Sequence, residues 1–280
     1  MAVQSVASAR QLTASGDGPG LSLWDRLRPS LFRTVVRLAI LAALCGIWEF
    51  CSGRVFPVFV VSSPAKVWTQ FGHWLSNGTL LPNLGVTLEE AVIGFLAGSI
   101  IGCLLGLVFG LYESVAKTIA PFANALYALP KVMLSPLIVV WFGIGMGMKD
   151  ILAALTVMFV VFYNVWNATR RIDKNLLDQF HLMGASRWDT IVELYLPAAV
   201  GWLLTSLRIA FPLALIGAIV GEFIASGEGI GYAVLAAAQQ YDAAGVLVGI
   251  ISITITAVCI DTVLAIVQRY VARWQGEGEL

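Results

Sequence analysis

Four ionisable side chains lie inside otherwise apolar stretches, where a charge is expensive and therefore marks either a function or a structural pair. They are Lys131, Arg208, Glu222 and Asp261. Prolines flank Lys131 at Pro130 and Pro136, and prolines free backbone carbonyls and kink a helix. A cation beside an interrupted helix suits an anionic solute. The candidate residues of a substrate pathway are therefore Lys131, Pro130, Pro136, Arg208 and Glu222.

Structural explanations compete with a pathway for these charges. Lys131 is expected about 18 Å along its helix at 1.5 Å per residue, where it could instead satisfy freed carbonyls or pair with an acid. Arg208 and Asp261 should lie at similar depths, about 15 Å and 10 Å from the inner surface. An ion pair is the favoured explanation for these two residues.

Sequence patterns typical of catalysis do not occur in the chain. It has no HExxH and no GxSxG, and its two histidines, His73 and His181, stand in segments expected on opposite sides of a membrane. An intramembrane enzyme is therefore unsupported. Four single cysteines, three of them in apolar runs, are interpreted as small buried hydrophobes rather than metal ligands or disulfides. They are Cys45, Cys51, Cys103 and Cys259.

The elements that position these residues must lie in a membrane. Hydrophobic residues make up 59% of the 280 and charged residues only 12%, against about 45–50% and about 25% in soluble domains. A net charge of zero gives no general attraction to nucleic acid. The composition predicts an all-α, polytopic membrane protein.

Six apolar runs approach the length of about 20 helical residues that a bilayer needs. They are Phe32–Cys51, Ala91–Leu111, Ile119–Phe142, Ile151–Trp166, Ala198–Phe223 and Ala244–Val267. The predicted organisation is a tail over residues 1–30, a six-helix domain over 31–274 and a second tail over 275–280. Between the fifth and sixth runs, GEGIGYAVLAAAQQYD is too short to cross and predicts a surface or partly inserted helix.

The distribution of Lys and Arg predicts the orientation, because cytoplasmic segments carry the excess. With the N-terminus inside, twelve Lys and Arg residues fall on the cytoplasmic side and three fall outside. Both termini are therefore expected in the cytoplasm.

The second run carries glycines at a step of four, which makes a groove that another helix backbone can approach closely. They are Gly94, Gly98, Gly102, Gly106 and Gly110. Packing within the chain is favoured over a subunit interface, although both use the same physics.

A long inner loop, about 168–197, is patterned as two helices joined by a turn. Residues 175–183 predict the first helix, and Gly184 ends it. Ser186 and Asp189 form a capping-box pattern that predicts a second helix ending before Pro197. A loop of this length and pattern usually carries a function.

This loop resembles the cytoplasmic coupling motif of ABC-importer permeases, in which a Glu-Ala-Ala triplet leads to a Gly and then to Leu-Pro. Gly184, Leu196 and Pro197 match, whereas the triplet reads Asp178-Gln179-Phe180. The phrases SSPAKVW, ALPKVMLSPLIVVWFGIGMGMKD and GEFIASGEGIGY are similar to those of the nitrate/sulfonate/taurine-type subfamily. The similarity runs from about Val60 to Trp274.

The resemblance implies a type I ABC-importer permease fold in a bacterial inner membrane, and a pathway for a small, often anionic solute. The implied partners are a cytoplasmic ATPase, a substrate-binding protein, a second permease copy and lipid. The chain has no Walker-type GxxxxGK[ST], so ATP and Mg²⁺ would be bound by the ATPase. The implied ATPase-coupling residues are Asp178, Gln179, Phe180, Gly184, Ala185, Ser186, Arg187, Leu196 and Pro197. A secondary transporter without an ATPase is the nearer alternative.

Overall fold

The computed structural model describes residues 23–274, so most of the predicted first tail and all of the second lie outside it. The chain divides into two compact units, Met1–Phe56 and Pro57–Leu280. In the first unit α2 (Leu23–Cys51) exposes its apolar window, Thr34–Cys51. Because α2 begins at Leu23, the described part of the predicted first tail, residues 23–30, is helical. Leu and Arg, which favour helix, extend it there.

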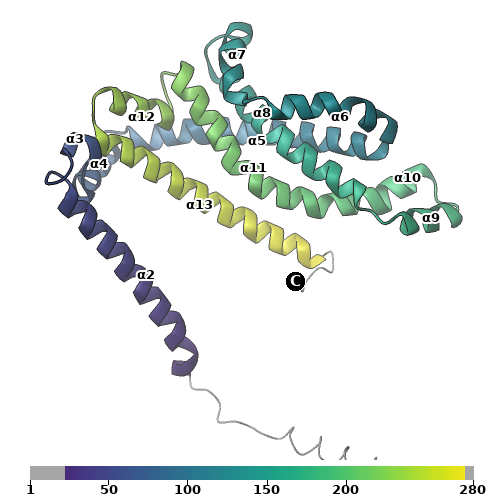
Figure 1. The fold of residues 1–280 in the computed structure, drawn as a ribbon, viewed down its shortest axis with the longest axis horizontal. Helices are drawn as coiled ribbons and strands as arrows, with labels where there is room; N and C mark the ends of the chain where they lie inside the picture. The colour runs from purple at the N-terminus through teal and green to yellow at the C-terminus, as the bar shows by residue number, and fades with distance from the viewer. Residues whose placement is uncertain (1–22, 275–280) are drawn as a thin grey trace, which may run out of the picture. The chain divides into compact units, whose positions relative to one another are not determined.

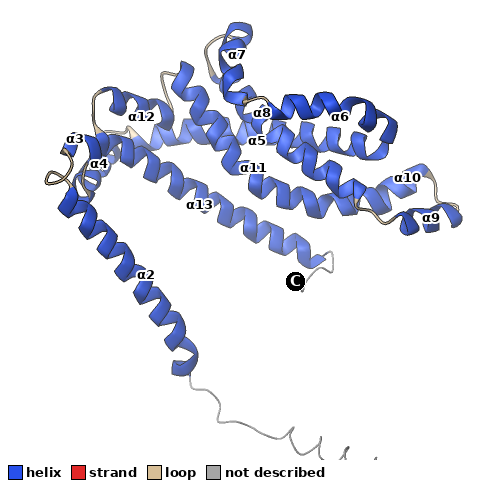
Figure 2. Ribbon diagram, in the orientation of Figure 1, coloured by secondary structure: helices blue, strands red, loops and turns tan. Residues whose placement is uncertain are grey.

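The second unit is built from helices alone within the described residues (Figures 1 and 2). Its elements are α3 (Val58–Val61), α4 (Pro64–Ser76), α5 (Leu80–Leu111), α6 (Glu113–Ala128), the 3₁₀ helix η1 (Lys131–Leu134), α7 (Ser135–Phe142), α8 (Met146–Arg170), α9 (Lys174–Leu182), α10 (Arg187–Thr190), the π-helix η2 (Ile191–Tyr195), α11 (Leu196–Ala225), α12 (Ile230–Gln239) and α13 (Ala243–Trp274).

The core lies where α5, α8 and α11 pack together, and α8 contacts both of the others extensively. Phe95 and Phe211 meet edge to face there, with ring centroids 5.4 Å apart. A Cβ atom added to any of the five predicted groove glycines of α5 would overlap atoms of α8. The glycine groove therefore packs within the chain, as the favoured alternative predicted.

The third predicted span is not one helix. The segments Ser114–Ala128 and Lys131–Phe142 meet at an angle of 87°, so the run Ile119–Phe142 is a bent pair of helices, interrupted beside the prolines as expected. Leu129 is extended, with φ −65° and ψ 131°, and Pro130 follows it. The break follows because a proline disfavours the helical conformation of the preceding residue and cannot donate a backbone hydrogen bond.

Five described helices are long and apolar enough to cross a membrane, and the bent pair makes up to six. The all-α membrane fold is thus confirmed. Two predicted spans were too short, because α5 begins at Leu80 and α8 runs from Met146 to Arg170. Helix α12 has 10 residues and is too short to span, as predicted.

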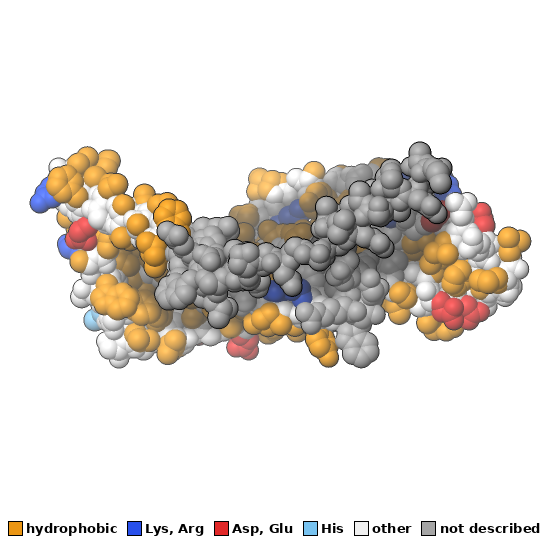
Figure 3. Space-filling model, turned by 90° about the horizontal axis from the view of Figure 1, so that it is seen from below, with side chains coloured by type: hydrophobic (Ala, Val, Ile, Leu, Met, Phe, Trp, Pro, Cys, Tyr) orange, Lys and Arg blue, Asp and Glu red, His pale blue; other side chains and the backbone are white. Residues whose placement is uncertain are grey.

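Apolar side chains cover much of the surface, as expected where lipid replaces water. Hydrophobic residues are spread over the face seen in Figure 3, whereas charged side chains gather in small groups. All four cysteines are free. The prediction that they are buried is wrong for Cys45 and Cys259, which are exposed, since an apolar side chain in a membrane protein need not face the core.

Candidate functional site

The loop between α8 and α11 has the predicted helix–turn–helix form. Gly184 adopts φ +79° after α9, a left-handed conformation that favours glycine. The Ser186 backbone N–H donates to Asp189 Oδ2 at 2.8 Å, and the Asp189 N–H donates to Ser186 Oγ at 3.2 Å. The predicted capping box is therefore confirmed, and it starts α10 directly after the turn.

The helix after the turn does not end before Pro197. Helix α10 continues through η2 into α11 without a break, and Pro197 lies in the first turn of α11. A proline ring clashes with the carbonyl four residues earlier in a regular α-helix. The wider π-helical turn at Ile191–Tyr195 accommodates the proline, which explains why the predicted helix end is wrong.

The turn between α9 and α10 exposes large apolar side chains. Leu182 and Trp188 are 87% and 71% exposed, and Met183 is also exposed. Of the predicted triplet, Asp178 and Gln179 are exposed while Phe180 is half-buried. Sequence reasoning did not single out Leu182 or Trp188, although apolar residues at the tip of an otherwise polar loop were the available signal.

Figure 1 places α9 and α10 at the opposite end of the second unit from α4 and α12. These two ends are called the α9 end and the α12 end below. The two histidines lie apart accordingly, His73 on α4 and His181 on α9. Within residues 23–274 no group of three His, Cys, Asp or Glu side chains is arranged to hold a metal ion.

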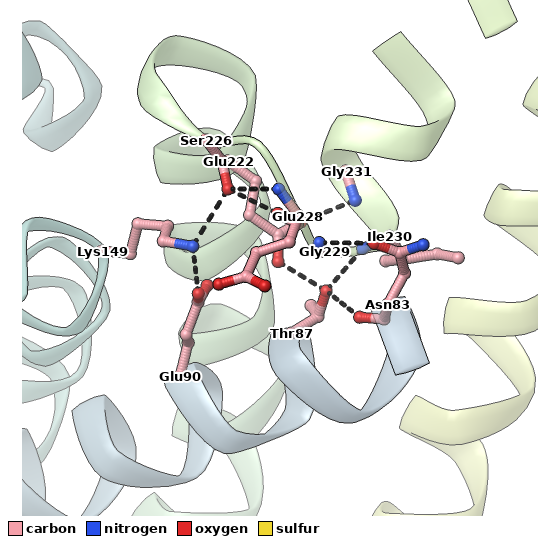
Figure 4. A network of polar contacts seen from close by, with 10 residues as sticks. All are labelled: Asn83, Thr87, Glu90, Lys149, Glu222, Ser226, Glu228, Gly229, Ile230 and Gly231. Atoms are coloured by element: carbon pink, nitrogen blue, oxygen red, sulfur yellow. Dashed lines mark hydrogen bonds and ion pairs between the residues drawn. The ribbon is translucent and has the colours of Figure 1, made fainter. Parts of the chain in front are cut away.

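A buried ion pair lies toward the α12 end. Lys149, in the first turn of α8, pairs with Glu90 of α5, and the two side chains are 2% and 0% exposed. Lys149 Nζ also donates to Ser226 Oγ at 3.1 Å, so Figure 4 shows it reaching toward two neighbours. Sequence reasoning missed this pair because Glu90 stood just before a predicted span and Lys149 was counted in an outer loop.

Glu222 belongs to the same network and holds the beginning of α12. Its carboxylate accepts from Thr87 Oγ1 at 2.5 Å and from the Gly231 N–H at 2.6 Å. Thr87 Oγ1 also accepts from the Ile230 N–H at 2.8 Å, and Asn83 Oδ1 accepts from the Gly229 N–H at 2.8 Å (Figure 4). Glu222 is 1% exposed, and its hydrogen bonds support the beginning of α12.

Lys131 lies half-buried at the break between α6 and η1. Its Nζ donates to the Tyr127 carbonyl at 2.6 Å and lies 4.4 Å from the centroid of the Tyr127 ring. The Phe159 ring centroid is 5.2 Å away. The ammonium group therefore satisfies a carbonyl near the break, as one of the two explanations predicted, while part of the side chain remains accessible.

The predicted Arg208–Asp261 ion pair is confirmed. Arg208 Nε and Nη2 donate to the two carboxylate oxygens of Asp261 at 2.7 Å and 3.0 Å, which is a bidentate arrangement. The pair is partly exposed, in contrast to Glu90–Lys149. The pair joins α11 to α13. Its partners differ from those of Lys131, which contacts Tyr127 and Phe159.

Residues 94–276 match the family of binding-protein-dependent transport system inner membrane components. The chain belongs to this family. It is a membrane permease subunit of an ABC importer, and ATP hydrolysis is the task of a separate subunit. The family assignment thus decides against a secondary transporter and an intramembrane enzyme.

Curated relatives support the same assignment. The chain is 26% identical over 243 residues to a putative aliphatic sulfonates transport permease protein of Bacillus subtilis (strain 168), covering 86% of this chain and 88% of the relative. It is 30% identical over 220 residues to a riboflavin transport system permease protein of Chloroflexus aurantiacus, covering 79% and 82%. The predicted resemblance to nitrate/sulfonate/taurine-type permeases is confirmed.

A solved structure supports the predicted fold. The inward-facing MetNI methionine ABC transporter superposes with a TM-score of 0.60 at 18% identity, covering 66% of this chain and 93% of that chain. The type I importer permease fold is therefore confirmed at the level of architecture.

Proposed function

We propose that the α9–α10 turn docks on the ATPase and that the bundle carries a small anionic solute across a bacterial inner membrane. In this proposal the α9 end is cytoplasmic, both termini lie inside, and the chain works as a homodimer with an external binding protein. The excess of Lys and Arg in the predicted inner segments supports this orientation.

One observation carries the docking proposal, namely the exposed apolar tip formed by Leu182, Met183 and Trp188. A polar loop that exposes several large apolar side chains together marks an interaction site. Gly184 and the capping box fix the shape of this turn. A protein partner that covers the tip would remove its apolar surface from water, and this burial would stabilise the complex.

Co-purification with the cognate ATPase subunit tests the docking proposal. Replacing Trp188 with Ser removes a large aromatic anchor, and we expect at least a tenfold loss of recovered ATPase, because buried aromatic residues dominate interface energies. Trp68→Ser is the matched control, since Trp68 is 78% exposed but lies on α4 at the α12 end. Equal ATPase recovery with Trp188→Ser and Trp68→Ser would refute the proposal.

The proposed pathway role of Lys131 rests on a positive charge that remains accessible at a helix break. The sulfonate relative, whose name specifies an anionic solute, supports the same substrate class. We expect Lys131→Gln to lower uptake of an anionic substrate at least tenfold while Lys131→Arg retains most of it, because only the latter keeps the charge.

Uptake by the assembled transporter, with its binding protein, measures this effect. A second readout is needed because Lys131 also bonds the Tyr127 carbonyl. The thermal unfolding temperature of the Gln variant should therefore be compared with that of the Arg variant. Unchanged uptake in a stable, assembled Lys131→Gln transporter would exclude the pathway role.

A further inference from the structure

A pocket of about 420 Å³ opens at the α9 end, where the corner between α5 and α6 faces the loop helices. Leu111 and Val115 line it from the corner, and Leu177 and Ile191 line it from the loop side. These four side chains are half-buried. The volume lies in the range of sites that hold small molecules, and the pocket joins the loop to the transmembrane core.

Basic and aromatic side chains complete the lining of this pocket. They include Arg187, His181, Tyr112 and Tyr195. No described lining residue is acidic, and Arg187 forms no ion pair with the described part of the chain. His181 Nδ1 lies 2.8 Å from the Leu177 carbonyl oxygen, so Nε2 is the nitrogen left for a ligand. The described lining of the pocket therefore combines apolar walls with the positive charge of Arg187.

The position of the pocket at the end of a membrane span fits a lipid headgroup. Leu111 is the last residue of the α5 span, and Tyr112 follows it directly, in the position that tyrosines favour at the edge of the hydrocarbon. In the proposed orientation this edge belongs to the cytoplasmic leaflet, which holds anionic lipids. Basic pockets between membrane helices on that side bind phosphate-bearing headgroups.

We infer that this pocket binds the phosphate headgroup of an anionic phospholipid, with Arg187 as its main ligand and the acyl chains along Leu111 and Val115. A guanidinium group binds phosphate oxygens in a bidentate manner. The lipid then bridges the α9–α10 loop and the α5–α6 corner. Arg187, which the resemblance assigned to ATPase coupling, thus faces a membrane ligand.

Native mass spectrometry of the delipidated permease tests the inference, with dioctanoyl-phosphatidylglycerol, dioctanoyl-phosphatidylcholine and inorganic phosphate as probes. We expect phosphatidylglycerol to bind in preference to phosphatidylcholine, and Arg187→Gln to weaken its binding about fivefold, as expected for one basic residue at an anionic headgroup. Lys174→Gln is the matched control, because Lys174 is exposed at the start of α9 and does not line the pocket.

Several results would overturn the inference. They are equal binding of the two lipids, wild-type binding by Arg187→Gln, an equal loss in Lys174→Gln, and displacement of the lipid by inorganic phosphate at the same concentration. The last result would indicate a free anion instead of a lipid.

The inference rests on the orientation in the proposed function, yet the two can fail separately. Lipid binding is measured on the permease alone, so loss of the lipid in Arg187→Gln is recorded independently of ATPase docking. Conversely, loss of ATPase docking in Trp188→Ser leaves lipid binding unchanged.

Discussion

At the residue scale, the ion pairs Glu90–Lys149 and Arg208–Asp261 differ in how deeply their side chains are buried. Glu90 and Lys149 are almost fully buried, whereas Arg208 and Asp261 are 45% and 39% exposed. A buried pair depends on both partners, because removing one leaves an uncompensated charge. Arg208 is a candidate residue of the substrate pathway, and a pair that faces the water of such a pathway gains little because water screens it.

We therefore expect Lys149→Met to destabilise the protein by about 3–5 kcal/mol, because Glu90 would remain buried without its cation. Arg208→Met, which breaks the exposed pair, should cost about 1 kcal/mol or less. The measurement is unfolding of the purified permease in detergent, followed by its thermal midpoint.

A double variant separates charge from packing in this experiment. Glu90→Gln combined with Lys149→Met removes both charges and should recover much of the lost stability. Equal midpoints for Lys149→Met and Arg208→Met would show that burial does not set the cost.

Sequence reasoning identified one pair and missed the other for a physical reason. Arg208 and Asp261 stand well inside apolar runs, so both were recognised as charges in the membrane. Glu90 and Lys149 stand at the edges of runs that proved too short, since α5 begins ten residues before Glu90 and α8 three residues before Lys149. Hydropathy identifies the apolar part of a helix that faces lipid. It does not identify polar residues near a helix end that are buried against other helices.

At the element scale, the close contact between α5 and α8 depends on glycines, which have no side chain to hold the two helices apart. A Cβ atom on Gly98 would overlap the Ala154 carbonyl oxygen and lie 2.9 Å from Val157 Cβ. Gly85 lies on the same helix, yet nothing lies within 4 Å of the corresponding position. The two glycines thus provide a matched comparison within one element.

Gly98→Ala should destabilise the protein by about 1–3 kcal/mol, because the two backbones must separate. Gly85→Ala should be neutral or slightly stabilising, since alanine favours helix over glycine by about 1 kcal/mol. Thermal unfolding of the two variants in the same detergent checks this difference. Similar midpoints would contradict close packing at Gly98.

The step of four glycines was sufficient to predict this contact, because small residues at that spacing form a groove on one helix face. An interruption beside Pro130 was predicted from the prolines, but the sharpness of the bend at Leu129–Pro130 was not. A hydropathy window adds the apolar residues on both sides of a bend and cannot register an angle of 87°. The direction of a chain after a proline depends on tertiary packing, which the local sequence does not specify.

At the scale of the whole molecule, one continuous helical segment connects the loop at the α9 end with the polar network at the α12 end. Helices α10, η2 and α11 run without interruption from Arg187 to Ala225. Glu222 lies near its far end and holds the first residues of α12. The conformation of the turn at Gly184 therefore bears on both ends of the bundle.

Substitution of Gly184 tests this connection through transport. A Cβ atom would have free space at Gly184, but φ +79° disfavours most side chains by about 1–2 kcal/mol. We expect Gly184→Val to uncouple ATP hydrolysis from uptake, whereas Gly184→Asn retains coupling because Asn tolerates this conformation.

The ratio of ATP hydrolysed to solute taken up by the reconstituted transporter measures coupling. A wild-type ratio in Gly184→Val would show that the shape of the turn does not matter. The same ratio in the Val and Asn variants would exclude backbone conformation as the cause of any loss.

The unbroken segment from Arg187 to Ala225 also has a mechanical consequence. It is roughly 55–60 Å long at about 1.5 Å per residue, so it can act as a lever across the bundle. Pivoting by about 5° around its middle moves its two ends by roughly 2–3 Å in opposite directions. A displacement of that size exceeds the tolerance of a hydrogen bond. Force applied to the turn at one end would thus reach the bonds that Glu222 makes with α12 at the other.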